Sequence, residues 1–199
     1  MRVVAVDDGA FRRSQRWAPL VAVVYSTPDR LEGVLRSRVR VDGTDATERI
    51  AEMLTRAPHL EGVRAILLDG VCFGGFNVLD LGRLSERTGR PVVAVTRRAP
   101  DLQRIRAALA RWFPRDHGAR YRRLTAHRLF RVQTTGAPVL AAAVGCTRRD
   151  AGTLLARTTR IGRWPEPLRV AHLIGHALGG GLPSRSPTER GRGRTRRSD

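Results

Sequence analysis

The sequence contains no lysine, so all 37 of its basic residues are arginine. Acidic residues are also few, 18 in all, and the formal net charge is therefore +19. A charge of this size exceeds what solubility requires and indicates a polyanionic partner, of which nucleic acid is the simplest. The alternative is a basic surface that interacts only with solvent.

Cysteine is scarce as well, and long hydrophobic runs are missing. Cys72 and Cys146 form no Cys-x-x-Cys pair, which excludes a disulfide framework and argues against a zinc site. No segment approaches the roughly 18 apolar residues that a membrane helix needs. The apolar run in MRVVAVDDG is too short for a signal peptide. We expect a cytoplasmic protein with no membrane association.

The arginines are clustered. Residues 97–131 hold eleven arginines against two acids, and residues 183–199 hold six against two. The second segment has no apolar residue apart from proline, a composition typical of disorder. We therefore predict a single domain over residues 1–182 and a disordered arginine-rich tail over 183–199. The tail either binds phosphates nonspecifically or has no role.

The order of apolar segments predicts a sheet flanked by helices. Short connections favour antiparallel pairing of the first three strands, and the later alternation of strands and helices demands parallel pairing with crossovers. This order resembles the ribonuclease H-like fold, an α/β class with a mixed five-stranded sheet and helices on both faces. Strands are expected at 2–6, 20–25, 31–41, 63–69 and 91–95, and helices at 42–57, 77–89 and 101–113.

Three further expectations concern local structure. Thr44 or Asp45 is expected to cap the helix over 42–57, and Glu48 stands where a capping box with Asp45 would place it. The helix over 101–113 presents one apolar stripe, formed by Leu102, Ile105, Leu109 and Trp112. Residues 127–133 and 138–144 predict a hairpin, and 148–160 and 166–179 predict two more helices.

Acidic residues end two of the predicted strands. Asp7 and Asp8 end the first strand and Asp69 ends the fourth, and parallel neighbours bring such ends to the ligand-binding edge of a sheet. Like charges this close require a compensating cation, and Mg²⁺ or Mn²⁺ prefers carboxylate ligands. Neighbours in a strand point to opposite faces. We therefore expect Asp7 as the metal ligand, with Asp8 bonding amides of the following turn.

A third carboxylate is expected near the end of the third strand. Asp42 and Asp45 are the candidates for metal binding. The alternative is structural, because aspartate is common in turns and at helix N-caps.

The segment after Asp69 combines glycines with aromatic residues. The glycines would let the backbone approach a bulky ligand, and the phenylalanines could stack on a base or pack in the core. Residues of this loop expected to contact nucleic acid are Phe73, Gly74, Gly75, Phe76 and Asn77.

Five blocks together resemble an archaeal family known as domain of unknown function 99. They are AVDDGAF, RVDGTDAT, LLDGVCFGGFNVLDL, PVVAVTRR and PEPLRVAHLI, and the likeness covers about residues 1–180. That family in turn resembles endonuclease V, a metal-dependent nuclease of ribonuclease H-like fold that cleaves near deaminated bases. The resemblance implies a role in DNA repair.

The resemblance also implies site residues. Asp7 matches the first metal ligand of endonuclease V, and Asp69 matches the ligand in its Val-Asp-Gly motif. The glutamate at the end of the third strand is replaced, with Asp42 closest. The wedge motif that opens the duplex is absent in recognisable form.

Basic residues of endonuclease V have counterparts too. Arg97, with Arg98 beside it, stands in place of a lysine and would contact phosphate. His172 is the counterpart of a late histidine. It pairs with His176 at helical spacing, a pattern that also suits core packing.

These observations predict a metal-dependent nuclease that hydrolyses phosphodiester bonds in DNA or RNA, and the resemblance implies cleavage near deaminated bases. Such a metal site would activate water and stabilise the leaving oxygen. One alternative is a non-catalytic nucleic-acid-binding protein on the same scaffold, which the missing glutamate favours. Another is an interaction subunit whose basic surface binds an acidic protein.

Overall fold

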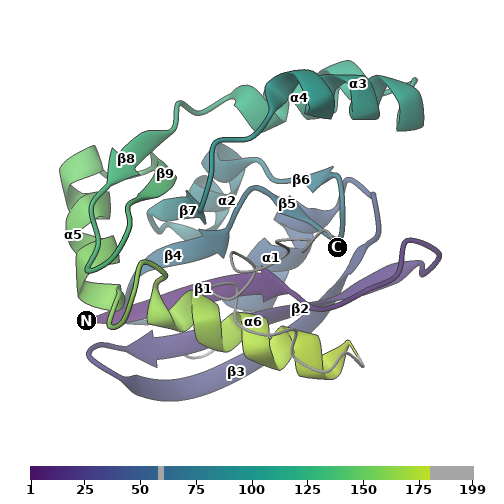
Figure 1. Cartoon of the computed structure of the whole chain (residues 1–199). Helices are drawn as coiled ribbons and strands as arrows, with labels where there is room; N and C mark the ends of the chain where they lie inside the picture. The colour runs from purple at the N-terminus through teal and green to yellow at the C-terminus, as the bar shows by residue number, and fades with distance from the viewer. Residues whose placement is uncertain (58–60, 180–199) are drawn as a thin grey trace, which may run out of the picture.

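The computed structural model describes residues 1–57 and 61–179, which form one mixed sheet covered by helices (Figure 1). Its seven strands lie in the order β3-β2-β1-β4-β7-β9-β8. The strands are β1 (Arg2–Asp8), β2 (Trp17–Ser26), β3 (Arg30–Arg40), β4 (Val63–Asp69), β7 (Val92–Thr96), β8 (Phe130–Val132) and β9 (Val139–Val144), with a small separate hairpin of β5 (Cys72–Phe73) and β6 (Asn77–Val78). The helices are α1 (Ala46–Thr55), α2 (Leu81–Thr88), α3 (Leu102–Trp112), α4 (His117–Thr125), α5 (Arg148–Thr158) and α6 (Glu166–Leu178).

The sheet confirms the expected ribonuclease H-like α/β class. Strands β1, β2 and β3 pair antiparallel, and β1, β4 and β7 pair parallel. These are the five predicted strands. The predicted hairpin corresponds to β8 and β9, which pair antiparallel with each other and through β9 with β7. The sheet therefore has seven strands because the hairpin extends it.

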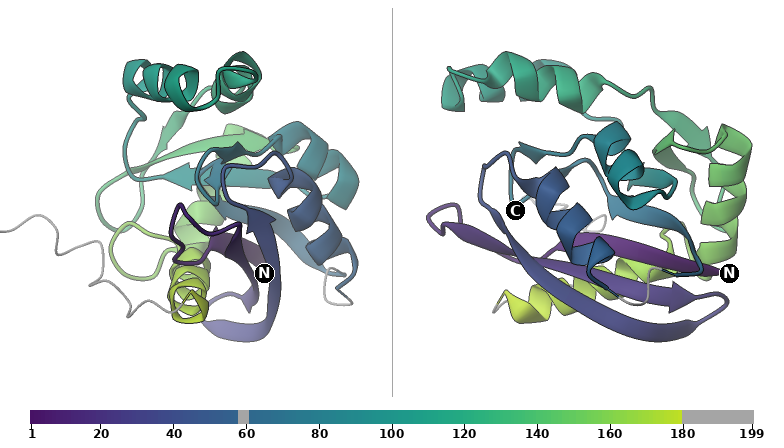
Figure 2. Two further views of the ribbon diagram at one scale, coloured as in Figure 1. Left: turned by 90° about the vertical axis from the view of Figure 1, so that its right-hand side faces the viewer. Right: turned by 180° about the vertical axis from the view of Figure 1, so that it is seen from behind.

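Helices cover both faces of the sheet, with α1 and α2 on one side and α6 on the other (Figure 2). Val4 and Val6 of β1 pack in the same core cluster as residues of α1 and α2, including Ile50. Val3 and Ala5 pack instead in the cluster that contains residues of α5 and α6. Each face of β1 is therefore apolar, as its continuous hydrophobic run predicted. The alternation continues to the end of the strand, so Asp7 and Asp8 point to opposite faces of the sheet.

The arginine-rich helices α3 and α4 lie beyond the sheet (Figure 1). The predicted apolar stripe of α3 is wrong in part: Leu109 is buried, whereas Leu102 and Trp112 are 40% and 58% exposed. Helix α4 was not expected, because its sequence offers no apolar stripe. It is anchored by Arg120, only 7% exposed, which donates to the backbone oxygens of Gly43 and Phe76.

The start of α1 corrects the expected capping box. Asp45 is the N-cap residue, but its side chain makes no capping hydrogen bond, and Glu48 pairs with Arg83 and Arg87 of α2. The amide of Ala46 donates instead to Oδ1 of Asn77, at 2.9 Å. A residue of the β6 strand thus replaces the local cap.

Asn77→Ala should lower the free energy of unfolding by about 2–4 kcal/mol, because it leaves the buried amide of Ala46 without a partner and removes two donated bonds. Those bonds run from Nδ2 to the Arg40 carbonyl and to Asp45 Oδ1. Urea denaturation measures the change. The control Asp101→Ala removes an exposed cap of α3 and should cost about 1 kcal/mol. An equal loss in both variants would contradict the role given to Asn77.

None of the described helices is both long and apolar enough to cross a bilayer. The arginine-rich tail over 183–199 lies outside the described residues.

Candidate metal centre

Asp7 and Asp69 lie side by side at the carboxyl ends of two neighbouring parallel strands. Val6 of β1 pairs with Leu68 of β4, so the next residue on each strand is an aspartate. Because side chains alternate along a strand, both carboxylates point to the face covered by α5 and α6. Asp7 is 4% exposed. Asp69 is partly buried, so the fold holds two acids together in a site that is only partly open to water.

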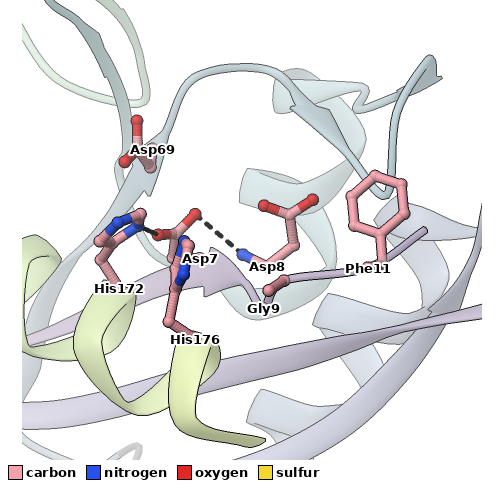
Figure 3. A pocket seen from close by; sticks show the side chains of 8 residues that line it. Asp7, Asp8, Gly9, Phe11, Asp69, His172 and His176 are labelled. Carbon is pink, nitrogen blue, oxygen red and sulfur yellow. Dashed lines mark hydrogen bonds and ion pairs between the residues drawn. The ribbon is translucent and has the colours of Figure 1, made fainter. Parts of the chain in front are cut away.

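Helix α6 adds a histidine to this pair (Figure 3). Nδ1 of His172 lies 2.8 Å from Oδ2 of Asp7, and Oδ1 of Asp7 accepts the amide of Asp8 at 2.8 Å. One potential ligand atom from each of Asp7, Asp69 and His172 lies within 4.8 Å of the others. This spacing suits a shared metal ion.

Two glycines allow α6 to cross the end of β1 closely enough to place His172. A Cβ atom built on Gly9 would lie 2.3 Å from the backbone oxygen of Gly175. One built on Gly175 would lie 3.0 Å from the backbone oxygen of Asp8. The backbones of β1 and α6 therefore touch, with no room for a side chain between them.

The electrostatics of this group favour a cation. Burial, and secondly the charge of Asp7, raises the pKa of Asp69 to about 7. Burial and the charge of Asp8 raise the pKa of Asp7 well above its usual value. Burial also lowers the pKa of His172, against the attraction of Asp69. Two carboxylates held together in this way are costly to ionise unless a positive charge joins them.

Asp8 takes the opposite face, as strand alternation predicted, but its partner is not the following turn. Its Oδ2 accepts the amide of Gly74 at 2.6 Å, which ties β1 to the loop after β4. Asp7, Asp8 and Asp69 line an open cleft of about 450 Å³ together with Gly9, Ala10, Phe11, His172 and His176. The two histidine rings are neighbours, with centroids 4.3 Å apart.

The structure does not bring Asp42 or Asp45 into the cluster of Asp7, Asp69 and His172. Asp42 Oδ1 accepts the amide of Phe76 at 2.8 Å. Asp45 accepts the Arg40 amide and the side-chain amide of Asn77. Both act as structural acceptors that join the end of β3 to the loop after β4, and we leave them out of the proposed ligand set.

The glycine loop packs closely against its neighbours, and two of the residues expected to contact nucleic acid are buried in it. Phe73 and Asn77 are fully buried, so neither can reach a base or phosphate. A Cβ on Gly75 would lie 2.3 Å from Oδ1 of Asp42, and one on Gly74 would lie 3.1 Å from a methyl group of Val39. The backbone approaches β3 closely here, where a ligand was expected.

Phe76 is only partly buried, but its ring packs against a neighbour. It meets the ring of Phe113 edge to face at a centroid distance of 5.8 Å. Since Phe113 follows α3, this contact joins the glycine loop to the α3–α4 pair.

Arg97 lies beside the acids, whereas Arg98 is exposed to solvent. The guanidinium of Arg97 stacks 3.6 Å from the ring centroid of Trp164. Its charge acts to lower the pKa values of Asp7 and Asp69. The sequence did not single out Trp164, or Phe11 in the cleft, because neither stands in a motif. Trp164 is recognised only from its stacking contact with Arg97 in the folded protein.

Known proteins resemble this chain over nearly all of the described residues. The model of the family described as Endonuclease dU matches residues 1–179. A UPF0215 protein of Methanothermobacter thermautotrophicus is 44% identical over 176 residues, which cover 87% of this chain and 85% of that protein. A crystal structure of a protein of unknown function from Archaeoglobus fulgidus is similar with a TM-score of 0.81 and 29% identity, over 90% of this chain and 99% of that one.

A more distant likeness concerns the fold alone. Endonuclease V of Ciona intestinalis was solved in complex with a 24mer DNA containing an inosine followed by a ribo-adenosine. It has a TM-score of 0.56 and 16% identity to this chain, and covers 85% of this chain and 82% of its own. The expected resemblance to the domain of unknown function 99 family is confirmed. This chain belongs to the Endonuclease dU family.

Proposed function

We propose that this protein is a metal-dependent endonuclease that hydrolyses phosphodiester bonds in nucleic acid next to deaminated bases. The observation that carries the proposal is the meeting of Asp7, Asp69 and His172 at an open cleft. The strongly basic composition supports a polyanionic substrate.

The donor set fits Mg²⁺ or Mn²⁺. Asp7 and Asp69 offer the carboxylate oxygens that both ions prefer, and the imidazole of His172 suits Mn²⁺ better than Mg²⁺. When bound, the ion supplies Lewis-acid stabilisation of the charge that develops on the phosphoryl oxygens. The raised pKa values of the two acids support a cation at this point, because a positive charge would favour their ionised forms.

The protein's own residues have distinct roles in this proposal. His172 orients the Asp7 carboxylate through the contact between Nδ1 and Oδ2. Arg97, fixed on the ring of Trp164, offers a rigid cation for a phosphate beside the acids. The cleft is open to solvent, so a nucleic acid strand can reach the carboxylates.

The family and the distant structural neighbour support a substrate with a deaminated base. The description Endonuclease dU refers to deoxyuridine, and the DNA bound by the Ciona intestinalis protein contains inosine. Uracil and hypoxanthine are both products of base deamination. We therefore propose DNA containing deoxyuridine as the first substrate to test.

Cleavage of labelled DNA strands tests the proposal. Strands carrying uracil, hypoxanthine or only normal bases are incubated with Mg²⁺ or Mn²⁺, and we expect cleavage of the uracil strand. Asp69→Asn should lower the rate by about a hundredfold or more, because it removes a ligand charge. Cleavage that persists in the variant would place the activity elsewhere. Metal-independent binding without cleavage would instead support the non-catalytic nucleic-acid-binding protein.

Mn²⁺ affinity should fall at least about tenfold for each pH unit below 7, because the ion then displaces a proton from Asp69, whose pKa is about 7 without metal, and the raised pKa of Asp7 can only steepen the fall. Above that pH the carboxylate is already ionised and the dependence should flatten. Calorimetric titration between pH 6 and pH 8, in buffers of different ionisation enthalpy, counts the protons released. An affinity that does not change across this range would rule out Asp69 as a ligand.

A further inference from the structure

A second cleft, larger than the first, adjoins the acidic cluster. Its volume is about 560 Å³, and its wall includes His172 and Arg97 together with residues 160–164, Glu166 and Arg169. His172 also lines the cleft of the acids. The two clefts therefore lie next to each other, with His172 at their common wall.

The second cleft has an excess of positive charge. Four arginines line it against Asp29 and Glu166. Glu166 is already neutralised, since both of its carboxylate oxygens accept from Arg169, at 2.7 Å and 2.5 Å. Within the described residues, Arg160 and Arg163 have no ion-pair partner. These two charges are available to a ligand.

Two of the arginines are also close enough to repel each other. Burial lowers the pKa of Arg97, the neighbouring charge of Asp69 opposes that effect, and the charge of Arg163 lowers it further. Arg97 cannot move away easily, because it stacks on Trp164, which is 9% exposed. Arginines that crowd one another at the wall of a cleft are typical of a site for an anion.

The loop that carries these charges is fixed and presents an apolar side chain between them. Thr135 donates to the backbone oxygen of Gly162 at 2.6 Å, and a Cβ on Gly136 would lie 2.8 Å from the Gly162 carbonyl carbon. Ile161 is 91% exposed, the most exposed large hydrophobic residue described. A ligand with an apolar group would remove the surface of this isoleucine from water, and that burial would favour binding.

We propose that the loop 160–163 is a second contact for a nucleic acid strand leaving the acidic cluster, in which Arg160 and Arg163 bind phosphates and Ile161 packs against a sugar or base. This inference rests on the proposed function for the identity of the ligand. A polynucleotide fits both clefts because it offers repeated anions joined by partly apolar groups. A free anion would not account for Ile161.

The salt dependence of binding tests the phosphate contacts. Anisotropy of a labelled single-stranded DNA containing deoxyuridine is measured in EDTA over a range of NaCl concentrations. For Arg160→Gln/Arg163→Gln, the slope of log affinity against log salt should be shallower than that of the wild type by about 1.4, or about 0.7 for each lost contact. Ile161→Ser should weaken binding and leave the slope unchanged.

A matched control removes the same charge at two arginines that line neither cleft. Arg56 follows α1 and Arg64 stands at the start of β4, and both are exposed. Arg56→Gln/Arg64→Gln should keep the wild-type slope, and thermal unfolding confirms that each variant is folded. Equal slopes for the two double variants, or no DNA binding by the wild type, would overturn the inference. If the protein does not cleave DNA, the proposed nuclease activity is refuted but the binding inference is not, because binding is measured without metal.

Discussion

Asp69→Asn should make the metal-free protein more stable at pH 8 and remove its stabilisation by Mn²⁺. The carboxyl of Asp69 has a pKa of about 7 in the folded protein, against 3.8 in the absence of the fold. Between these values the folded state binds more protons than the unfolded state, so wild-type stability falls as pH rises through this window. Asparagine has no charge to bury. The expected gain is on the order of 2–4 kcal/mol at pH 8.

Urea denaturation at pH 5 and pH 8, with EDTA or with Mn²⁺, measures both effects. The gain from Asp69→Asn should be smaller at pH 5, roughly half of that at pH 8 or less, because only part of the window between 3.8 and about 7 has been crossed there. Asp150→Asn is the matched control, since hydrogen bonds from Thr147 lower the pKa of Asp150. That variant should not gain stability, and it should keep the response to Mn²⁺. An Asp69→Asn protein that is less stable at pH 8 and still stabilised by Mn²⁺ would refute a metal site at these acids.

Gly9→Ala should cost about 1–3 kcal/mol of stability, because the new methyl group meets the α6 backbone and a rigid core resists expansion. The nearest atom would be the Gly175 oxygen, at 2.3 Å, and the side chain of Pro19 lies at 2.9 Å. Relief requires α6 to move away from β1. His172 would then move from Asp7, so Mn²⁺ affinity should fall by about tenfold or more.

Gly152→Ala is the control for this change. Gly152 lies within α5, and no atom comes within 4 Å of a Cβ built there. Alanine is the better helix former, so this variant should gain about 0.5–1 kcal/mol and bind Mn²⁺ as the wild type does. Thermal unfolding and metal titration compare the two proteins. Unchanged metal affinity in a folded Gly9→Ala protein would show that the β1–α6 contact does not position His172.

The pair of acids was the part of the site most open to sequence reasoning. Asp7 and Asp69 each end a short, continuous apolar run, and the alternation of side chains separates Asp7 from Asp8. Parallel pairing of these strands follows from the helix between them. Side-chain alternation within each strand and one crossover connection decide where these acids lie, so their position can be predicted from the sequence.

The glycine loop shows the opposite case. Its glycines, phenylalanines and asparagine suggested ligand binding, yet Phe73 and Asn77 are buried and Asp42 bonds the Phe76 amide. Positions of this kind depend on which distant segment packs against the loop. A side chain that could bind a ligand or fill a core looks the same in sequence until its neighbours are known.

By itself, the sequence determined the basic charge, the α/β order of elements and the position of Asp7 and Asp69 at the ends of two strands, because these depend on composition and on short-range periodicity. Only the tertiary structure decided that His172, 165 positions from Asp7, joins the acids, and that Arg97 stacks on Trp164. Such contacts arise when helices and loops are packed onto a sheet. Their geometry is set by close fits such as that of Gly9 against Gly175, which no local pattern records.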